Sequence, residues 1–560
     1  MCGIFALLMQ SVSTLDEEKM YEAFMKGQKR GPEYSCFEPQ WKDENLYLGF
    51  HRLAINGLDT LSHQPIIQNN LAVVCNGEIY NHKELFKRQK ICPQTNSDCE
   101  VILPLYERNG IHCANMLDGV FSFVLYDKDK RQIIVARDPY GVRPLYECIY
   151  ENNHIGFASD VESLCFGPIK TIRSFPPGSI AVYDCMDNVW YKTHHEQYFH
   201  NISYLSLTVK EKPIEYYMFE CVKRMKKSIQ KRVDNCEREV ACLLSGGLDS
   251  SLISAFVCKT YKEKTGKILE TYSIGLEGGE DLSYAKKVAH HIGSNHKEVL
   301  FTNKEFIDSI PHVIKDIESY DTTSVRASVG NWNIGKYISE HSKAKVIFNG
   351  DGADELAGGY LYFNECPNNE EFHKETCRLL HNINRFDVLR SDKSISSHGL
   401  EPRTPFLDKE FTKFYLSIPI KYRNHNHCTD SQKCEKYFIR KSIELFEPIL
   451  LPKEILWRKK EAFSDGVSST EKSWYEIIQD YLEENTLEYN GTQEVYAINP
   501  PMTKEQQYYR TLFHNTFPQC CAGLIPYFWM PQYVKHNGDA SARTLSLYHR
   551  STKDEITERL

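Results

Sequence analysis

The sequence predicts two domains of different fold class: a strand-rich α+β domain at the amino end, and then an α/β domain built on a parallel sheet. Short apolar or alternating runs, punctuated by Gly, Pro and Asn, extend to about residue 195, as is typical of strand-rich domains. From about residue 216, helical patterns alternate with short buried strands, which favours a parallel sheet covered by helices. We expect an amino-terminal domain over 2–195, a linker over 196–215, a second domain over 216–540 and a tail over 541–560.

The strands of the first domain are expected where apolar runs are bounded by turn residues. They are "LYLGFHRLAI" (46–55), "LAVVCNGEIY" (71–80), "GVFSFVLYD" (119–127), "RQIIVARD" (131–138) and "GSIAVYD" (178–184). Each run is rich in β-branched or aromatic residues, and few long helical segments lie between them.

The second domain opens with five elements in strict alternation. Helices are expected over 215–233, 250–266 and 283–293, with strands over 239–245 and 270–276. The polar stretch 365–375 and the segment around 484–507 are expected to be surface insertions or mobile loops.

The composition is that of a globular protein, with 41% hydrophobic and 25% charged residues among 560. A formal net charge of -8 offers no basic footprint for nucleic acid. No apolar run approaches the roughly 20 residues that span a bilayer, and "MCGIFALLMQ" does not look like a signal peptide. The 19 cysteines contain no C-x-x-C pair, so neither a disulfide framework nor a zinc site is expected. We expect a cytoplasmic protein without a nucleic-acid or membrane partner.

Cys2, in "MCGIF", is the first candidate catalytic residue. If Met1 is removed, the thiol and a free α-amine share one residue, and an α-amine with a pKa of about 7.7–8 can act as the base for its own side chain. The alternative is a chance cysteine at a frayed terminus.

Two expected strands supply groups that such a nucleophile needs. Arg52, in "HRLAI" (51–55), lies on one of them and could bind an amino-acid carboxylate in bidentate fashion. Asn76 and Gly77 lie at the end of the run "LAVVC", where a side-chain amide and a backbone N–H can converge on an oxyanion. Alternatively, Arg52 forms a surface ion pair and "NG" forms a hairpin turn.

Six motifs in order, "MCGIF", "RGPE", "HRLAI", "NGEIYNH", "SDCE" and "RDPYGVRPLY", make the first domain resemble the class II glutamine amidotransferases. The resemblance implies a four-layer αββα fold in which the amino-terminal cysteine attacks the glutamine side-chain amide and releases ammonia. It implies that Asn76 and Gly77 form the oxyanion hole and that Arg52 holds the glutamine α-carboxylate. Asp98 and Gly77 would hold the α-amino end, and the implied glutamine pocket also includes Leu53, Ile55 and Glu78.

The run "EVACLLSGGLDSSLISAF" (239–256) is predicted to form a strand, a glycine loop and a helix, with "SGGLDSS" (245–251) at the loop. Gly246 and Gly247 allow the backbone to approach an anion, Ser245 and Ser250 add hydroxyls, and the helix amino terminus favours negative charge. The G-x-x-x-x-G-K-S/T spacing of a Walker-type phosphate loop is absent from this run. Because Asp249 lies inside this phosphate-type loop, a cation is expected to neutralise it, and Mg²⁺ is the hard cation that pairs carboxylates with phosphates. The alternative is a glycine-rich turn without a ligand.

A second unit of this kind, "KVIFNGDGADELAGGY", carries Asp351 and Asp354 after another strand. Parallel strands end on one edge of a sheet, so this loop can face the first one. Asp249 and Asp354 are then the expected Mg²⁺ pair. The alternative is a solvated acidic surface loop.

"SGGLDSS" resembles the loop of the ATP pyrophosphatases. With "SYDTTSVRASVG", "HGLEPRTPFLD", "WRKKEAFSDG" and "ASARTLSLY", the whole chain resembles the family of glutamine-hydrolysing asparagine synthetases. The resemblance implies that aspartate and ATP form β-aspartyl-AMP, which ammonia from an internal tunnel converts to asparagine, and it suggests a homodimer. The implied catalytic residues are Arg326, Asp351 and Lys460; the ATP site takes Leu244, Ser245, Gly246, Gly247, Asp249, Ser250, Ile274, Asn349 and Gly350; the aspartate site takes Asp354 and Arg403.

The chain departs from the family pattern at several positions. Lys29 and Glu33 replace a usual histidine and aspartate, Asn56 replaces an apolar residue, and Asp351 replaces a glutamate. "EPRTPFLD" carries Pro402 and Thr404 at usually apolar positions. These differences bear on the tuning of the pockets and on turnover.

Two rival readings remain open. A related amide- or lactam-forming synthetase shares the two-domain plan, although Cys2 and an intact "NGEIYNH" argue against a lactam-forming enzyme. An inactive regulatory homologue would be expected to lose its reactive positions first, whereas this chain retains them.

Overall fold

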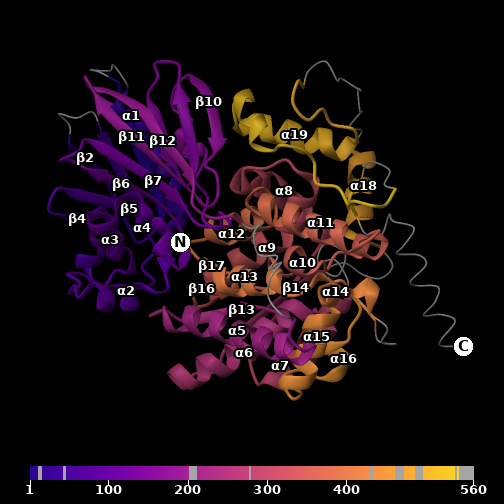
Figure 1. The fold of residues 1–560 in the computed structure, drawn as a ribbon. Coiled ribbons are helices and arrows are strands. Elements are labelled where there is room, and N and C mark those ends of the chain that lie inside the picture. The colour runs from indigo at the N-terminus through magenta and orange to yellow at the C-terminus, as the bar shows by residue number, and fades with distance from the viewer. Residues whose placement is uncertain are drawn as a thin grey trace, which may run out of the picture.

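The amino-terminal half folds into two antiparallel sheets of six strands each, and these sheets pack face to face (Figure 1). The structure is a computed structural model that describes residues 1–10, 16–41, 46–200, 211–276, 279–428, 433–460, 472–485, 496–535 and 539–541. The strand orders are β10-β8-β9-β1-β3-β2 and β12-β11-β7-β6-β5-β4.

The strands of these two sheets are β1 (Gly3–Leu8), β2 (Tyr34–Trp41), β3 (Leu46–Arg52), β4 (Ile66–Gln68), β5 (Leu71–Ile79), β6 (Gly119–Asp127), β7 (Gln132–Arg137), β8 (Tyr146–Tyr150), β9 (Ile155–Ala158), β10 (Ile169–Ser174), β11 (Ser179–Met186) and β12 (Val189–Gln197). The helices are α1 (Glu17–Met25), α2 (His82–Gln89), α3 (Ile102–Asn109) and α4 (Cys113–Met116).

Side-chain alternation along the strands creates the layers. In β1, Ile4 and Ala6 enter the core between the two sheets, whereas Phe5 and Leu7 enter a second core with residues of α1. On the other sheet, residues of β5 and β6 pack against α2 and α3. The order helix, sheet, sheet, helix confirms the predicted four-layer fold.

The second half is built on a five-stranded parallel sheet with the order β15-β14-β13-β16-β17. Its strands are β13 (Val240–Leu243), β14 (Glu270–Leu276), β15 (Asn295–Phe301), β16 (Val346–Phe348) and β17 (Glu401–Arg403). Its helices are α5 (Ile214–Asp234), α6 (Leu248–Thr265), α7 (Glu280–Ile292), α8 (Asn303–Ile317), α9 (Thr322–His341), α10 (Ala353–Ala357), α11 (Asn369–Asn382), α12 (Asp387–Ser396), α13 (Lys409–Ser417), α14 (Ile420–Arg423), α15 (Tyr437–Phe446), α16 (Lys453–Leu456), α18 (Trp474–Glu484) and α19 (Lys504–Thr516).

Helices cover both faces of this sheet. In β13, Val240 and Cys242 pack in a core with residues of α5 and α6, whereas Ala241 packs in the core that contains residues of α8 and α9. A strand buried on both faces reads as a continuous apolar run, which explains why "VACL" shows no polar alternation. The predicted α/β domain is therefore confirmed.

One predicted loop is wrong. The polar stretch 365–375 contains the start of α11, where the Asn368 side chain accepts a hydrogen bond from Glu371 N and caps the helix. Phe372 and Leu379 are buried on one face of it. The predicted linker and the second predicted loop fall partly on 201–210 and 486–495, which lie outside the described residues.

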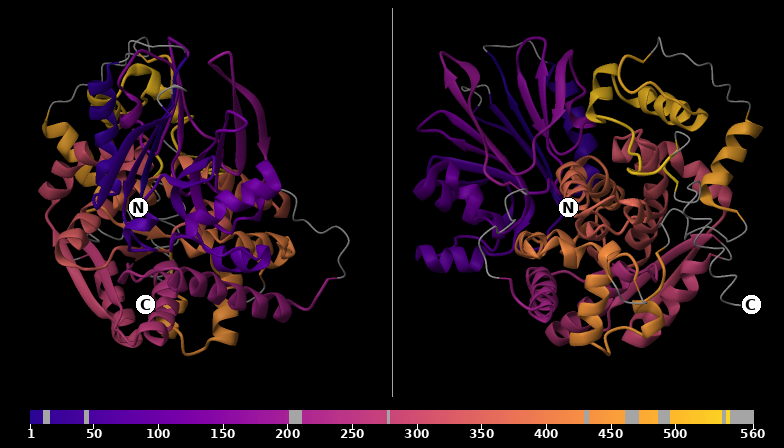
Figure 2. Two further views of the ribbon diagram at one scale, coloured as in Figure 1. Left: turned by 90° about the vertical axis from the view of Figure 1, so that its left-hand side faces the viewer. Right: turned by 45° about the vertical axis from the view of Figure 1, so that its right-hand side comes forward.

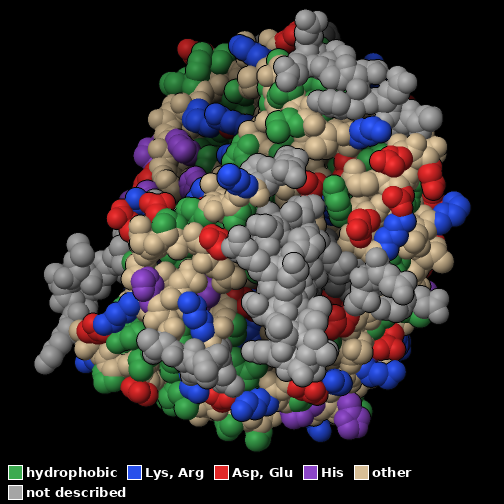
Figure 3. Space-filling view, turned by 90° about the vertical axis from the view of Figure 1, so that its right-hand side faces the viewer, with side chains coloured by type: hydrophobic (Ala, Val, Ile, Leu, Met, Phe, Trp, Pro, Cys, Tyr) green, Lys and Arg blue, Asp and Glu red, His purple; other side chains and the backbone are tan. Residues whose placement is uncertain are grey.

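The two halves lie side by side in Figure 1 and in the right-hand view of Figure 2, and the chain begins at the junction between them. Side chains of both charge signs are interspersed on the face shown in Figure 3. Among the described helices, none combines the length and apolar character needed to cross a bilayer.

Candidate active sites

Cys2 lies just before β1 and is hydrogen-bonded within the first domain, whereas Met1 contacts the second domain. Its Sγ donates a hydrogen bond to Leu53 O at 3.7 Å, and Arg30 Nε donates to Cys2 O at 3.1 Å. The Met1 amine is buried and donates to Leu400 O in the second domain at 3.4 Å. Burial raises the pKa of the Cys2 thiol to about 11 and lowers the pKa of the Met1 amine to about 5. With Met1 in place, both groups are therefore neutral at pH 7.

Asn76 and Gly77 occupy the end of β5, as predicted. Asn76 is fully buried, and its Nδ2 donates to Ser159 Oγ at 3.3 Å. An amide nitrogen carries two hydrogens, so a second donor remains for a ligand. Asn76 Oδ1 has no hydrogen-bond partner among the described residues.

Arg52, at the end of β3, points its guanidinium at the loop that follows. Nη1 donates to Asp59 O at 2.8 Å, and Nη2 donates to Gly57 O. A substrate carboxylate would have to replace these carbonyl oxygens. Leu53 and Ile55 are buried just beyond the strand, and Leu53 O accepts the hydrogen bond from Cys2 Sγ.

Glu78 and Asp98 form a buried acidic cluster around Asn235. Asn235 Nδ2 lies 2.9 Å from Glu78 Oε2 and 3.4 Å from Asp98 Oδ2, and Ile79 N donates to Asp98 Oδ2 at 2.6 Å. Burial raises the pKa of both carboxyls above the usual range. The sequence did not indicate Asn235, because the residue belongs to the other domain and lies in no recognised motif.

Arg403 does not lie with the predicted ATP residues. Its guanidinium is buried against Glu401 (Nε–Oε1, 2.8 Å) and Glu78 (Nη2–Oε2, 3.3 Å). The side chain therefore leaves β17 toward the glutamine cluster, and this geometry does not support the prediction that Arg403 binds aspartate.

A cavity of about 220 Å³ opens at the carboxyl ends of β13, β14 and β16. Its lining includes every predicted ATP residue except Gly246: Leu244, Ser245, Gly247, Asp249, Ser250, Ile274, Asn349 and Gly350. Gly246 has a φ of +77°, and a Cβ there would lie 2.5 Å from Ala285 N. Glycine is thus required for the loop to turn.

The two acidic loops meet because β13 and β16 are neighbours. A Cβ on Gly350 would lie 2.8 Å from Asp249 Cβ, so only glycine permits this approach. Asp351 also lines the cavity, where its Oδ1 lies 3.5 Å from Arg390 Nη2.

Two lysines lie between the predicted metal ligands. Lys436 Nζ is 2.5 Å from both Asp249 Oδ2 and Asp354 Oδ1, and Lys460 Nζ is 2.7 Å from Asp354 Oδ2. Burial alone would raise the pKa of Asp354, but the two ammonium groups outweigh it and hold that pKa well below its usual range. Lys460 was predicted, whereas Lys436 was not.

The donor set suits Mg²⁺ only in part. Asp249 Oδ1 and Asp351 Oδ2 are buried and have no hydrogen-bond partner among the described residues, and carboxylate oxygens are the ligands that Mg²⁺ prefers. The described residues contain no group of three or more His, Cys, Asp or Glu that could hold a metal by itself. Such a site fits a cation that also takes phosphate oxygens.

A second cavity of about 100 Å³ shares Thr323, Tyr360, Asp387 and Arg390 with the first. Arg326 lines only the second cavity, where its guanidinium pairs with Glu505 and Asp539 at 2.6 Å each. Asp387 and Arg390 lie one turn apart on α12, paired at 2.8 Å. No motif pointed to this pair, and only the fold brings it to the cavity.

The fold and the two sites define a class: an amidotransferase domain joined to a nucleotide-binding synthetase domain. Two family models match the chain, a glutamine amidotransferase domain over residues 1–212 and asparagine synthase over 221–371 and 364–538. The chain belongs to the family of glutamine-hydrolysing asparagine synthetases.

Relatives match over nearly the full length. The asparagine synthetase [glutamine-hydrolyzing] of Gallus gallus is 41% identical over 577 residues, covering 99% of this chain and 100% of the relative. Those of Rattus norvegicus and Homo sapiens are 40% and 39% identical with the same coverage. Among solved structures, the PRPP amidotransferase from B. subtilis complexed with ADP and GMP covers 53% of this chain and 81% of its own at 16% identity, with a TM-score of only 0.30.

Proposed function

We propose that the protein makes L-asparagine from L-aspartate, with L-glutamine as nitrogen donor and ATP cleaved to AMP and pyrophosphate. The observation that carries the proposal is the meeting of Asp249, Asp354, Lys436 and Lys460 on one cavity beside the serine–glycine loop. Paired carboxylates and ammonium groups at a helix amino terminus suit a polyphosphate. Full-length likeness to named synthetases supports the substrates.

In the glutamine half-reaction, the Cys2 sulfur attacks the side-chain amide carbon and its proton passes to the α-amine freed by loss of Met1. The tetrahedral oxyanion is bound by Asn76 and Gly77, and collapse expels ammonia. Water then cleaves the thioester to glutamate. Arg52 binds the α-carboxylate once Gly57 and Asp59 release it, while Glu78 and Asp98 face the α-amino group.

In the second half-reaction, an oxygen of the aspartate β-carboxylate attacks the α-phosphorus and pyrophosphate leaves. Lys436 and Lys460 stabilise the charge that develops on the phosphoryl oxygens. Ammonia then attacks the activated carbonyl carbon, and AMP leaves. We assign the α-carboxylate and α-amine of aspartate to Arg390 and Asp387, where the two cavities join.

Mg²⁺ would be held by Asp249 and Asp354 together with the phosphates, and when bound it would neutralise phosphate charge. The unpartnered Asp249 Oδ1 supports this assignment. The roles of Arg326 and Asp351 in catalysis, passage of ammonia through an internal tunnel, a homodimer and a cytoplasmic location stay predictions.

Cys2→Ala tests the proposal against its rivals. The variant is expected to lose glutamine-dependent asparagine formation and to keep the ammonia-dependent reaction, because only the first half-reaction needs the thiol. A lactam-forming enzyme or an inactive regulator would form no asparagine with either nitrogen donor. Full glutamine use by the variant would refute Cys2 as the nucleophile.

A further inference from the structure

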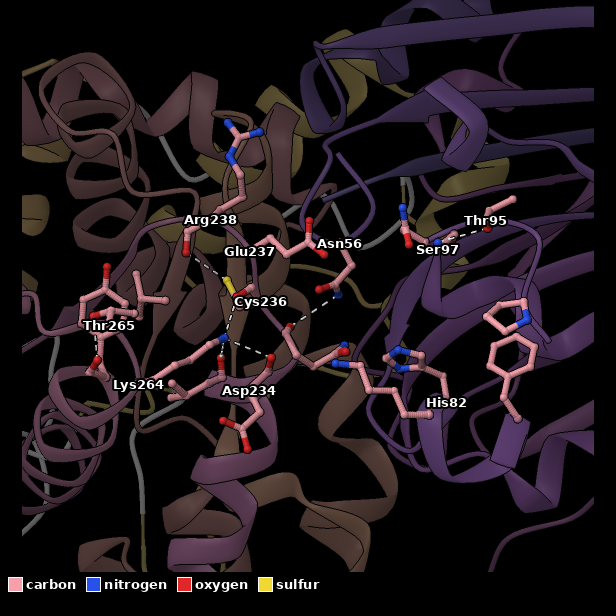
Figure 4. Close-up of a pocket in the computed structure, with 18 of the residues that line it drawn as sticks. Asn56, His82, Thr95, Ser97, Asp234, Cys236, Glu237, Arg238, Lys264 and Thr265 are labelled. Carbon is pink, nitrogen blue, oxygen red and sulfur yellow. Dashed lines mark hydrogen bonds between the residues drawn. The ribbon is translucent and has the colours of Figure 1, made fainter. Parts of the chain in front are cut away.

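Residues 235–238, in the connection between α5 and β13, lie along residues 53–56, a segment that includes Leu53 and Ile55 of the predicted glutamine pocket. Glu237 N donates to Ile55 O at 3.0 Å, and Asn56 Nδ2 donates to Asn235 O at 3.4 Å. Figure 4 shows Asn56 beside this connection, at the edge of a cavity of about 880 Å³ between the domains. Residues of both domains thus line this cavity.

Arg238 and Glu33 form an ion pair that binds the backbone of Ala54 in the same segment, and we call this pair the clamp. Ala54 N donates to Glu33 Oε2 at 2.7 Å, Arg238 Nη1 donates to Ala54 O at 3.2 Å, and Arg238 Nη2 lies 3.0 Å from Glu33 Oε1. Both polar groups of residue 54 are therefore fixed by one ion pair that crosses the domain boundary. The preceding residue, Leu53, accepts the Cys2 thiol hydrogen bond.

Asn235 joins the connection to the acidic part of the pocket. Its side-chain amide is buried and bonds both Glu78 and Asp98. The same four residues of chain thus contact the backbone beside the nucleophile and the two carboxylates assigned to the substrate amine.

The contacts also give a role to two departures from the family pattern. Glu33 and Asn56, which replace an aspartate and an apolar residue, each bond the connection. Lys29, a third departure, crosses the boundary elsewhere and pairs with Asp316 at 2.5 Å.

We propose, on the basis of the proposed function, that residues 235–238 of the synthetase domain complete the glutamine site, with Arg238 and Asn235 as positioning residues for the glutamine half-reaction. Arg238 holds residues 53–55 against Cys2, and Asn235 orients Glu78 and Asp98. Neither residue lines the ATP cavity, so the second half-reaction with free ammonia does not depend on them.

The test is steady-state kinetics on full-length Arg238→Ala, Glu33→Ala, the double variant and Asn235→Ala, with glutamine and with ammonia. Loss of the clamp is expected to raise KM for glutamine about tenfold, as loss of one or two hydrogen bonds to a partly buried pair would. The rate with ammonia should stay unchanged. The double variant should be no worse than the stronger single one, because both remove one interaction. Arg238→Lys, which keeps the charge, should recover part of the loss.

Lys29→Ala is the matched control. Lys29 and Asp316 are 26% and 16% exposed, against 24% and 31% for Arg238 and Glu33, and their pair also crosses the boundary. Its removal should leave KM for glutamine unchanged.

Any of three results would overturn the inference. The KM for glutamine in the Arg238 and Asn235 variants could stay within about twofold of wild type, their rates of asparagine formation could fall equally with glutamine and with ammonia, or Lys29→Ala could raise KM as much as they do. Glutamate release without aspartate reports the same KM independently of synthesis. If wild type hydrolyses glutamine but forms no asparagine, the proposed function fails while the inference is still decided by this assay.

Discussion

Lys436 lies between Asp249 and Asp354, and its side chain is only 1% exposed. The two carboxylates could be predicted to face each other because each follows a strand of a parallel sheet. The lysine could not, because it is the N-cap residue of α15, far along the chain and outside any motif. Asn235 and Arg390 could not be predicted either, because they too lie outside any motif. Cys2, Asn76 and Lys460, in contrast, were recognisable from the short motifs that contain them.

Lys436→Met is expected to reduce asparagine formation roughly 10²-fold with either nitrogen donor, because a fixed cation at the phosphates is lost. Rates at saturating ATP and aspartate, with glutamine and with ammonia, measure the effect. Glutamate release should fall far less.

Lys441→Met provides the control on the same helix. Lys441 pairs with Glu444 at 2.6 Å and is 28% exposed, so its removal should leave both rates near wild type. Unchanged activity in Lys436→Met would show that this lysine does not act on the phosphates.

Helix caps and the alternation of apolar and polar residues explain where most of the helices and strands form. β3 and β5 were predictable because they form period-2 or fully apolar runs, and α5 and α6 because of their length. Helix α11 was missed because its first turn is polar and exposed, so only the Asn368 cap and the spacing of buried Phe372 and Leu379 mark it. Helix α9 likewise depends on its cap: the buried Asp321 side chain accepts from Ser324 N at 2.8 Å and from Trp529 N at 2.8 Å.

Asp321 should make stability depend on pH. Burial raises the pKa of Asp321 from 3.8 to about 6, so the folded state favours the protonated form. The contribution of Asp321 to the free energy of unfolding is fully present below pH 3.8 and is lost as pH rises through 6. The change amounts to roughly 3 kcal/mol.

Asp321→Asn removes this titration. It also loses one acceptor, but that cost is the same at every pH. Unfolding midpoints compared between pH 4 and pH 7 should therefore fall less steeply in the variant than in wild type. Parallel pH profiles for the two proteins would contradict the assignment.

The two domains are joined by buried charges as well as by apolar contact. Arg30 pairs with Asp392 at 2.8 Å and Lys393 pairs with Asp160 at 2.9 Å, each pair linking one domain to the other. Both domains were evident from the sequence, yet this junction was not, because its partners are separated by more than two hundred residues and charged residues ordinarily signal surface. The junction also contains Met1, Arg403 and the Arg238–Glu33 pair that binds residue 54, so the predicted glutamine site lies at this boundary.

One chain is expected to couple glutamine hydrolysis to aspartate activation. A full product balance for purified protein with Mg-ATP, aspartate and glutamine tests this coupling. Asparagine, glutamate, AMP and pyrophosphate should form in equal amounts. Absence of AMP with both glutamine and ammonia would show that the chain does not activate aspartate.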